Sequence, residues 1–122
     1  MRADPISPAP APPIRRGHAG RLENALRNLA LGHGTVIEHR ERSWASITFA
    51  GTRHSLRIAF EGPEAIEGGE ALIACLPDHE FALPGRLVAD ATICAVDHVL
   101  EAADGSGPRL VVTCEFLVLE DA

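Results

Sequence analysis

Hydrophobic and polar residues alternate with two different periods along the chain, first helical and then strand-like. Apolar residues from Leu22 to Leu29 fall at helical spacing, and this stripe predicts an amphipathic helix over about 19–31. Gly32 follows the stripe, and glycine is the usual residue just past the C-terminal end of a helix. We expect this helix to be the first ordered element.

A β-hairpin is the clearest local pattern after the helix. Residues 44–50 and 54–60 both alternate between apolar and polar side chains. The glycine between them, Gly51, suits the first position of a two-residue turn. In that register Ile47 lies opposite Leu56 on one apolar face, so we expect the chain to double back at Gly51.

The second half of the chain predicts loops and further strands. Residues 62–70 contain proline and glycine and predict a loop, whereas 71–76 is uniformly apolar, as in a strand buried on both faces. A short strand is expected at 81–83. Residues 87–101 fit a helix by length and a strand by their β-branched residues. We expect a long, bent strand there, because 110–119 needs an antiparallel neighbour.

Together these elements predict an α+β fold, in which one N-terminal amphipathic helix packs on a mostly antiparallel five- to six-stranded sheet. The proline-rich start of the chain predicts a disordered arm over 1–17, followed by a single domain over 18–122. Both faces of 110–119 carry apolar residues, which leaves one sheet face or edge to be covered. We expect a second copy of the chain to cover it, as a homodimer.

Charge is distributed unevenly along the chain. All eleven basic residues are arginine, a composition typical of a GC-rich bacterial genome, and the net charge is −6. Residues 1–57 carry nine arginines against four acidic residues, and residues 58–122 carry two against thirteen. The net negative charge argues against nucleic acid as the partner. The two halves are instead expected to neutralise each other, within one chain or between subunits.

Cysteine usage and hydropathy indicate a cytoplasmic protein. Cys75, Cys94 and Cys114 are widely spaced, lie in apolar runs and form no C-x-x-C pair, so we expect reduced, buried thiols. No apolar stretch has the length of a signal-peptide core or a membrane span, and we expect no membrane association.

Four titratable residues are candidates for catalysis: His79, Asp90, Asp97 and His98. Asp97 interrupts an otherwise apolar strand face, where a carboxylate needs hydrogen-bond donors such as an arginine. Adjacent strand residues point to opposite faces, so Asp97 and His98 are not expected to share one site.

The stretch 78–85, DHEFALPG, resembles the hotdog-fold dehydratases and thioesterases. Those proteins carry a histidine or aspartate near a Phe-Pro-Gly stretch and end in long antiparallel strands. Here the phenylalanine and the Pro-Gly pair are two residues further apart, and the strand before the central helix is missing. The resemblance implies a small hydrolase or dehydratase in which His79 is the general base and Asp90 orients it. His98 with a carboxylate is the other arrangement that we consider.

Binding sites have fewer candidates. Arg53 and Arg57 lie two residues apart and are candidates for contact with an anionic ligand. None of the six histidines has H-x-x-x-H spacing, and no phosphate-binding loop occurs, so we expect no metal and no cofactor. We therefore favour a non-catalytic interaction or small-ligand-binding module over an enzyme. Convergence of the four catalytic candidates in one pocket would favour the enzyme.

Overall fold

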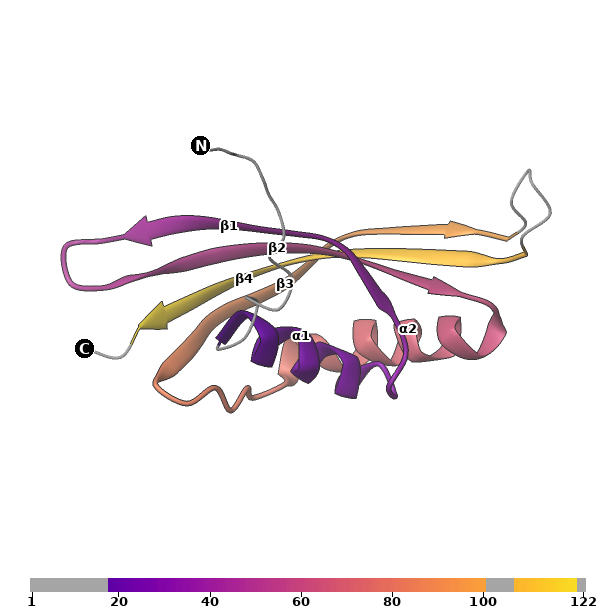
Figure 1. Cartoon of the computed structure of the whole chain (residues 1–122), viewed down its shortest axis with the longest axis horizontal. Coiled ribbons are helices and arrows are strands. Elements are labelled where there is room, and N and C mark those ends of the chain that lie inside the picture. Colours follow the sequence, from indigo (N-terminus) through magenta and orange to yellow (C-terminus); the bar gives the residue numbers. More distant parts are fainter. Residues whose placement is uncertain (1–17, 101–106, 121–122) are drawn as a thin grey trace, which may run out of the picture.

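The computed structural model describes residues 18–100 and 107–120. Its elements are α1 (His18–Leu29), β1 (Thr35–Ala45), β2 (Ala50–Glu61), α2 (Pro63–Cys75), the 3-10 helix η2 (Leu76–Asp78), β3 (Arg86–Val99) and β4 (Arg109–Glu120). The four strands form one antiparallel sheet in the order β1-β2-β4-β3. Figure 1 shows both α-helices on the same face of this sheet, so the fold is α+β with two layers.

The hydrophobic core lies between the helices and the sheet, because each element is apolar on the side that it presents there. In β4 every second side chain is buried against the helices, as strand geometry requires: Leu110, Val112, Cys114, Phe116 and Val118. From the helix layer, α1 contributes Leu22 and Leu26, and α2 contributes Ile66 and Leu72.

Helix α2 replaces the loop expected at 62–70 and the strand expected at 71–76, and both predictions were wrong. Pro63 starts the helix, where a missing backbone N–H costs nothing. Gly68 lies inside this helix, where the lack of a side chain allows α2 to approach α1 closely. A Cβ at Gly68 would lie 2.3 Å from the carbonyl oxygen of Ala30.

The β1–β2 hairpin turns at residues 46–49, so the predicted turn at Gly51 was wrong. Strand β1 continues to Ala45, and Ile47 is fully exposed at the turn instead of pairing across the sheet. Gly51 lies inside β2, where a Cβ would be 2.3 Å from the carbonyl oxygen of Val118 in β4. Glycine is needed here for the close approach of two strands, not for a turn.

The fold-class prediction was therefore wrong in its elements. The described residues contain four strands instead of five to six, because no strand forms at 71–76 or 81–83. Two α-helices share the helical layer, and α1 does not lie at the N-terminus, since it begins at His18. The arm predicted over 1–17 lies outside the described residues.

The prediction for residues 87–101 is confirmed as far as the described residues extend. This segment forms β3, which pairs along β4 and contains two register shifts, one at Ala89 and one at Cys94. Such bulges bend a strand and make an edge less able to pair with another sheet.

Candidate functional site

Two histidines on neighbouring strands meet between the sheet and α1. In the β1–β2 ladder Glu41 is the partner of His54, and His39 precedes Glu41 by two residues on the same face. His39 Nε2 lies 2.9 Å from His54 Nδ1. His39 Nδ1 lies 2.5 Å from Glu23 Oε2, which comes from α1. A chain of polar contacts therefore links the helix to two strands.

We call His39, His54, Glu41 and Glu23 the histidine cluster. Its inner end is buried, since His54 is fully buried and the side chain of His39 is 3% exposed. Its outer end is Glu41, which is exposed. Donation from His39 Nδ1 to the Glu23 carboxylate assigns the tautomer of the neutral ring, with the Nε2 lone pair directed at His54.

One potential ligand atom from each of His39, Glu41 and His54 lies within 4.8 Å of the other two. Imidazole nitrogens and carboxylate oxygens are the donors that zinc takes in proteins besides thiolates. The geometry thus brings together a donor set that can hold a divalent ion, although the sequence predicted no metal site.

The cluster was missed because the hairpin turn was misplaced. With a turn at 46–49, paired residues in most of the ladder have numbers that sum to 95, which sets Glu41 opposite His54. With the predicted turn at Gly51, His54 would instead face Phe49. The signal that could have found the site is the spacing of His39 and Glu41, two residues apart on one strand face.

The four catalytic candidates are all exposed and do not converge on one site. Asp90 and Asp97 lie seven residues apart along β3, a separation of about 20 Å. His98 pairs with the core residue Leu110 and so faces the opposite side of the sheet from Asp97. His79 follows η2 and contacts Phe81, with ring centroids 4.6 Å apart.

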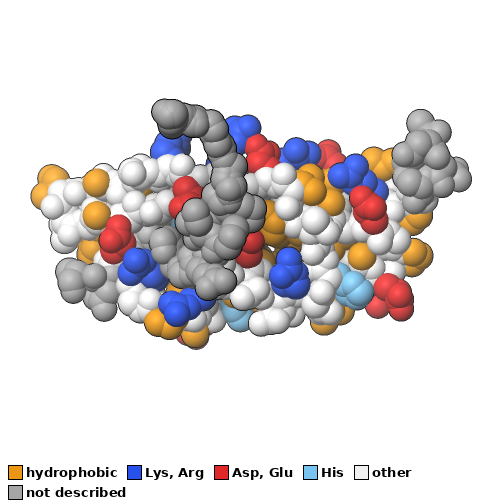
Figure 2. Space-filling model, in the orientation of Figure 1, with side chains coloured by type: hydrophobic (Ala, Val, Ile, Leu, Met, Phe, Trp, Pro, Cys, Tyr) orange, Lys and Arg blue, Asp and Glu red, His pale blue; other side chains and the backbone are white. Residues whose placement is uncertain are grey.

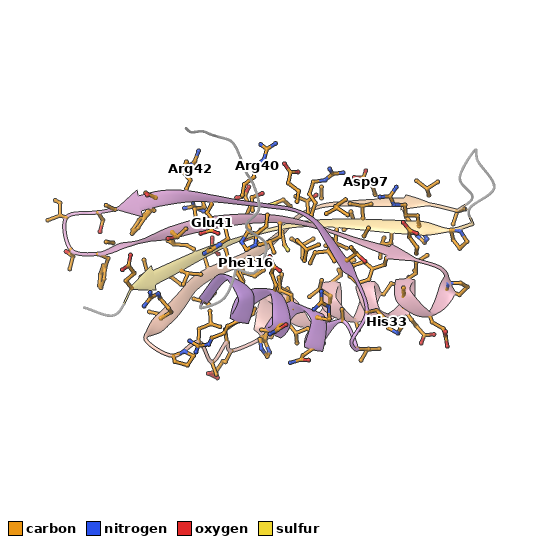
Figure 3. All side chains as sticks on the ribbon, in the orientation of Figure 1. His33, Arg40, Glu41, Arg42, Asp97 and Phe116 are labelled. Carbon is orange, nitrogen blue, oxygen red and sulfur yellow. The ribbon has the colours of Figure 1, made fainter. Side chains whose placement is uncertain are left out.

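The sheet face turned away from the helices is called the open face here. Figure 1 shows no described helix or strand over it, and in Figure 3 Arg40, Arg42 and Asp97 project from it, whereas Glu41 and Phe116 point toward the helices. Strand alternation places on this face the charged residues Glu38, Arg40, Arg42, Arg53, Arg57, Asp90, Asp97 and Glu115, among others.

Charges on the open face are sorted by strand. Arg40, Arg42, Arg53 and Arg57 lie on β1 and β2, and the two aspartates lie on β3 at the opposite edge, while Arg109 and Glu115 lie on β4 between them. Glu38 forms ion pairs with Arg40 and with Arg57, the latter at 3.8 Å. Five of these side chains have no ion-pair partner within residues 18–100 and 107–120: Arg42, Arg53, Asp90, Asp97 and Glu115.

The two predicted anion-binding residues therefore have different surroundings. Arg57 is engaged by Glu38, whereas Arg53 lines a hollow of about 350 Å³. Its other lining residues are Arg40, Glu41, Arg42, Ser55 and Glu115, so two carboxylates stand beside the three arginines. In Figure 2 basic side chains lie along the top of the molecule, with acidic side chains among them.

The hairpin end of the molecule carries exposed apolar side chains. Ile47 is fully exposed at the turn, and Phe49 and Leu87 are more than half exposed. Phe49, Leu87 and Leu119 line a hollow of about 770 Å³ at the end of the sheet. Leu87 and Leu119 also belong to the open face, so this apolar end continues onto it.

Comparison with known proteins supports the fold alone. No family model matches the chain, and no curated protein matches it. A chain of the solved virion of a native gene transfer agent particle is similar in structure, with a TM-score of 0.58 and 12% sequence identity. The alignment covers 87% of this chain and 94% of that one. Among the described residues, no helix has the length and hydrophobicity that crossing a bilayer requires.

Proposed function

We propose that the protein is a non-catalytic interaction module that forms a homodimer by packing two open faces against each other. The observation that carries this proposal is the sorting of charge without an ion-pair partner, with Arg42 and Arg53 on the β1–β2 half of the face and Glu115, Asp90 and Asp97 on the β4–β3 half. A twofold axis parallel to the strands lays β1 of one copy over β3 of its partner. Arg42 then meets the partner's Asp90, and the same pair forms a second time by symmetry.

The apolar residues of the face fit the same axis. Trp44, Gly51, Leu119 and Leu87 form one row across the four strands at the hairpin end. The twofold axis places Trp44 over the partner's Leu87, apolar on apolar. A twofold axis perpendicular to the strands would lay β1 over β1 and bring the arginines of both copies together, which like-charge repulsion opposes.

The face is large enough for a stable dimer. Four strands of about twelve residues cover a surface of roughly 40 by 19 Å. That is close to the roughly 800 Å² per partner that specific interfaces commonly bury. Two such sheets would pack about 10 Å apart, as in other two-sheet sandwiches.

Two further observations agree with this reading. The similar chain comes from a virion, and an assembly role is in keeping with that source. Cys75, Cys94 and Cys114 are all free thiols, which supports a reducing, cytoplasmic location for the dimer.

Light scattering coupled to size exclusion tests the dimer at micromolar concentration. We expect the wild-type chain to be dimeric, and Arg42→Asp and Asp90→Arg each to weaken association on the order of 10- to 100-fold, because each reversal creates two repulsive contacts per dimer. The double variant R42D/D90R restores the opposite charges and should restore the dimer. Arg21→Asp, at an exposed position of α1, is the matched control and should leave the dimer unchanged.

The single tryptophan reports which face is used. Trp44 lies on the open face, so its fluorescence should change on dilution through the dimer–monomer transition. A monomeric wild-type chain, or a double variant that stays monomeric, would contradict the proposal. A monomer in which Arg42 and Arg53 bind inorganic phosphate would assign the arginine-lined hollow to a small anion instead.

A further inference from the structure

We propose that the histidine cluster is a binding site for one zinc ion, held by His39 Nε2, His54 Nδ1 and a carboxylate oxygen of Glu41. This site lies on the helix-covered side of the sheet, so it is independent of the dimer interface on the open face.

The distance between the two histidine nitrogens suits a tetrahedral ion after a small adjustment. Zinc–nitrogen bonds of about 2.0–2.1 Å set two nitrogens roughly 3.3 Å apart in a tetrahedral site. His39 Nε2 and His54 Nδ1 are already 2.9 Å apart, so their separation must increase by about 0.4 Å. The ion would take the place of the hydrogen bond between the two rings. A ligand atom of Glu41 lies within 4.8 Å of one from each histidine, so this exposed side chain would move closer by up to about 1.5 Å to bind the ion.

Glu23 gives the first ligand the orientation that zinc sites commonly show. Histidine ligands usually donate their second ring N–H to a carboxylate, which fixes the tautomer and makes the other nitrogen a better donor. His39 does this through Nδ1, 2.5 Å from Glu23 Oε2. The carboxylate comes from α1 and the ligands come from β1 and β2, so the packing of helix on sheet holds the arrangement.

Charge and access also suit a divalent cation. Glu23 and Glu41 supply two negative charges, which match the charge of the ion. The neighbouring arginines Arg40, Arg42 and Arg53 belong to the opposite face of the sheet, because they alternate with the cluster residues along β1 and β2. Exposed Glu41 marks the side from which an ion would enter.

A buried pair of histidines can also exist as a purely structural hydrogen bond, and zinc binding separates the two explanations. Isothermal titration of zinc into the full-length chain, previously dialysed against a chelator, should show one ion per chain. The titration is repeated in a Cys75→Ser/Cys94→Ser background, because both thiols are exposed and can bind zinc adventitiously. Binding should persist there with the same stoichiometry.

Three variants assign the ligands. Glu23→Gln should weaken zinc binding by about 10- to 100-fold, as loss of an orienting carboxylate does elsewhere. Glu41→Gln, which keeps the side chain's size at an exposed position, should weaken it at least as much. Glu67→Gln, on the exposed side of α2, is the matched control and should leave the affinity unchanged. The ring resonances of His39 and His54 should shift on titration.

Two outcomes would overturn the proposal. One is the absence of zinc binding by the folded wild-type chain. The other is zinc binding that Glu41→Gln leaves intact and that moves neither histidine ring, since the ion would then sit elsewhere. Neither outcome depends on the oligomeric state, so a failed zinc site and a failed dimer are distinguishable.

Discussion

The three cysteines differ in how deeply their side chains are buried. Cys114 lies fully buried in the core side of β4, and desolvation, followed by the nearby Cys94, raises the pKa of its thiol to about 12. Cys75 and Cys94 are exposed, so the expectation that all three thiols are buried was wrong. Burial and then the carboxylates of Glu115 and Asp90 also raise the pKa of Cys94.

Alkaline pH should destabilise the fold through Cys114. The chain has no lysine and no tyrosine, so thiols are the side chains that titrate between about pH 8 and 12. The pKa of the Cys114 thiol rises from 9.0 in the unfolded chain to about 12 in the fold. Its contribution to stability is therefore complete below about pH 9 and is lost as the pH rises toward 12.

Urea unfolding at several alkaline pH values measures this effect. The free energy of unfolding should fall less steeply with pH in Cys114→Ala than in the wild type. Cys75→Ala, at an exposed position, serves as the control and should follow the wild-type slope. Equal slopes in all three proteins would show that Cys114 does not titrate as expected.

Among the elements, α2 depends on residues that ordinarily weaken a helix. Gly68 and Gly69 lie in its middle and are both buried. A Cβ at Gly69 would lie 2.7 Å from the Leu110 side chain and 2.8 Å from the Phe60 ring. The two glycines therefore allow the helix to contact α1 and the sheet at short range, and this contact offsets their low helix propensity.

Gly68→Ala should consequently destabilise the protein. At an exposed helix position the same change stabilises by up to about 1 kcal/mol. Here the added methyl group meets the backbone carbonyl of Ala30, and overpacking of this kind costs about 1–3 kcal/mol. Glu67→Ala, one residue earlier and exposed, should change stability by less than about 0.5 kcal/mol. A gain in the unfolding free energy of Gly68→Ala would refute the close helix contact.

In the molecule as a whole, the two α-helices of the described residues cover one side of the sheet. The helices bury one face, and the open face carries both an apolar end and charges that lack ion-pair partners among the described residues. The proposed dimer would bury both, so folding and association should be thermodynamically linked.

Thermal stability should therefore depend on protein concentration. For a dimer of this size we expect Tm to rise by about 3 °C for each tenfold increase in concentration. Arg42→Asp should show a lower Tm with little concentration dependence. R42D/D90R should regain the wild-type Tm and its dependence on concentration. Calorimetry over a hundredfold concentration range makes the comparison, and a wild-type Tm that stays constant would argue for a monomer.

The amino-acid pattern was sufficient to specify those parts of the fold that depend on residues close together in the chain. The apolar stripe from Leu22 to Leu29 specifies a helix, because helical spacing puts these residues on one side. The β-branched and apolar runs of 87–101 and 110–119 specify two long strands, and their mutual need for a partner predicted the β3–β4 pairing. Of the candidate sites, the anion-binding role of Arg53 stays a prediction, and Arg53 lines a polar hollow, whereas the four catalytic candidates do not converge.

The hairpin turn, α2 and the histidine cluster depend instead on contacts between segments that are far apart in the chain. Gly51 and Gly68 are of a residue type that is common in turns and loops. Each is needed because a Cβ at its position would meet a backbone carbonyl far away in sequence, that of Val118 for Gly51 and that of Ala30 for Gly68. His39 and His54 are likewise brought together by the strand register, which the misplaced turn had hidden. A local pattern cannot report these features, because the steric contacts and pairings that cause them exist only once distant segments have packed together.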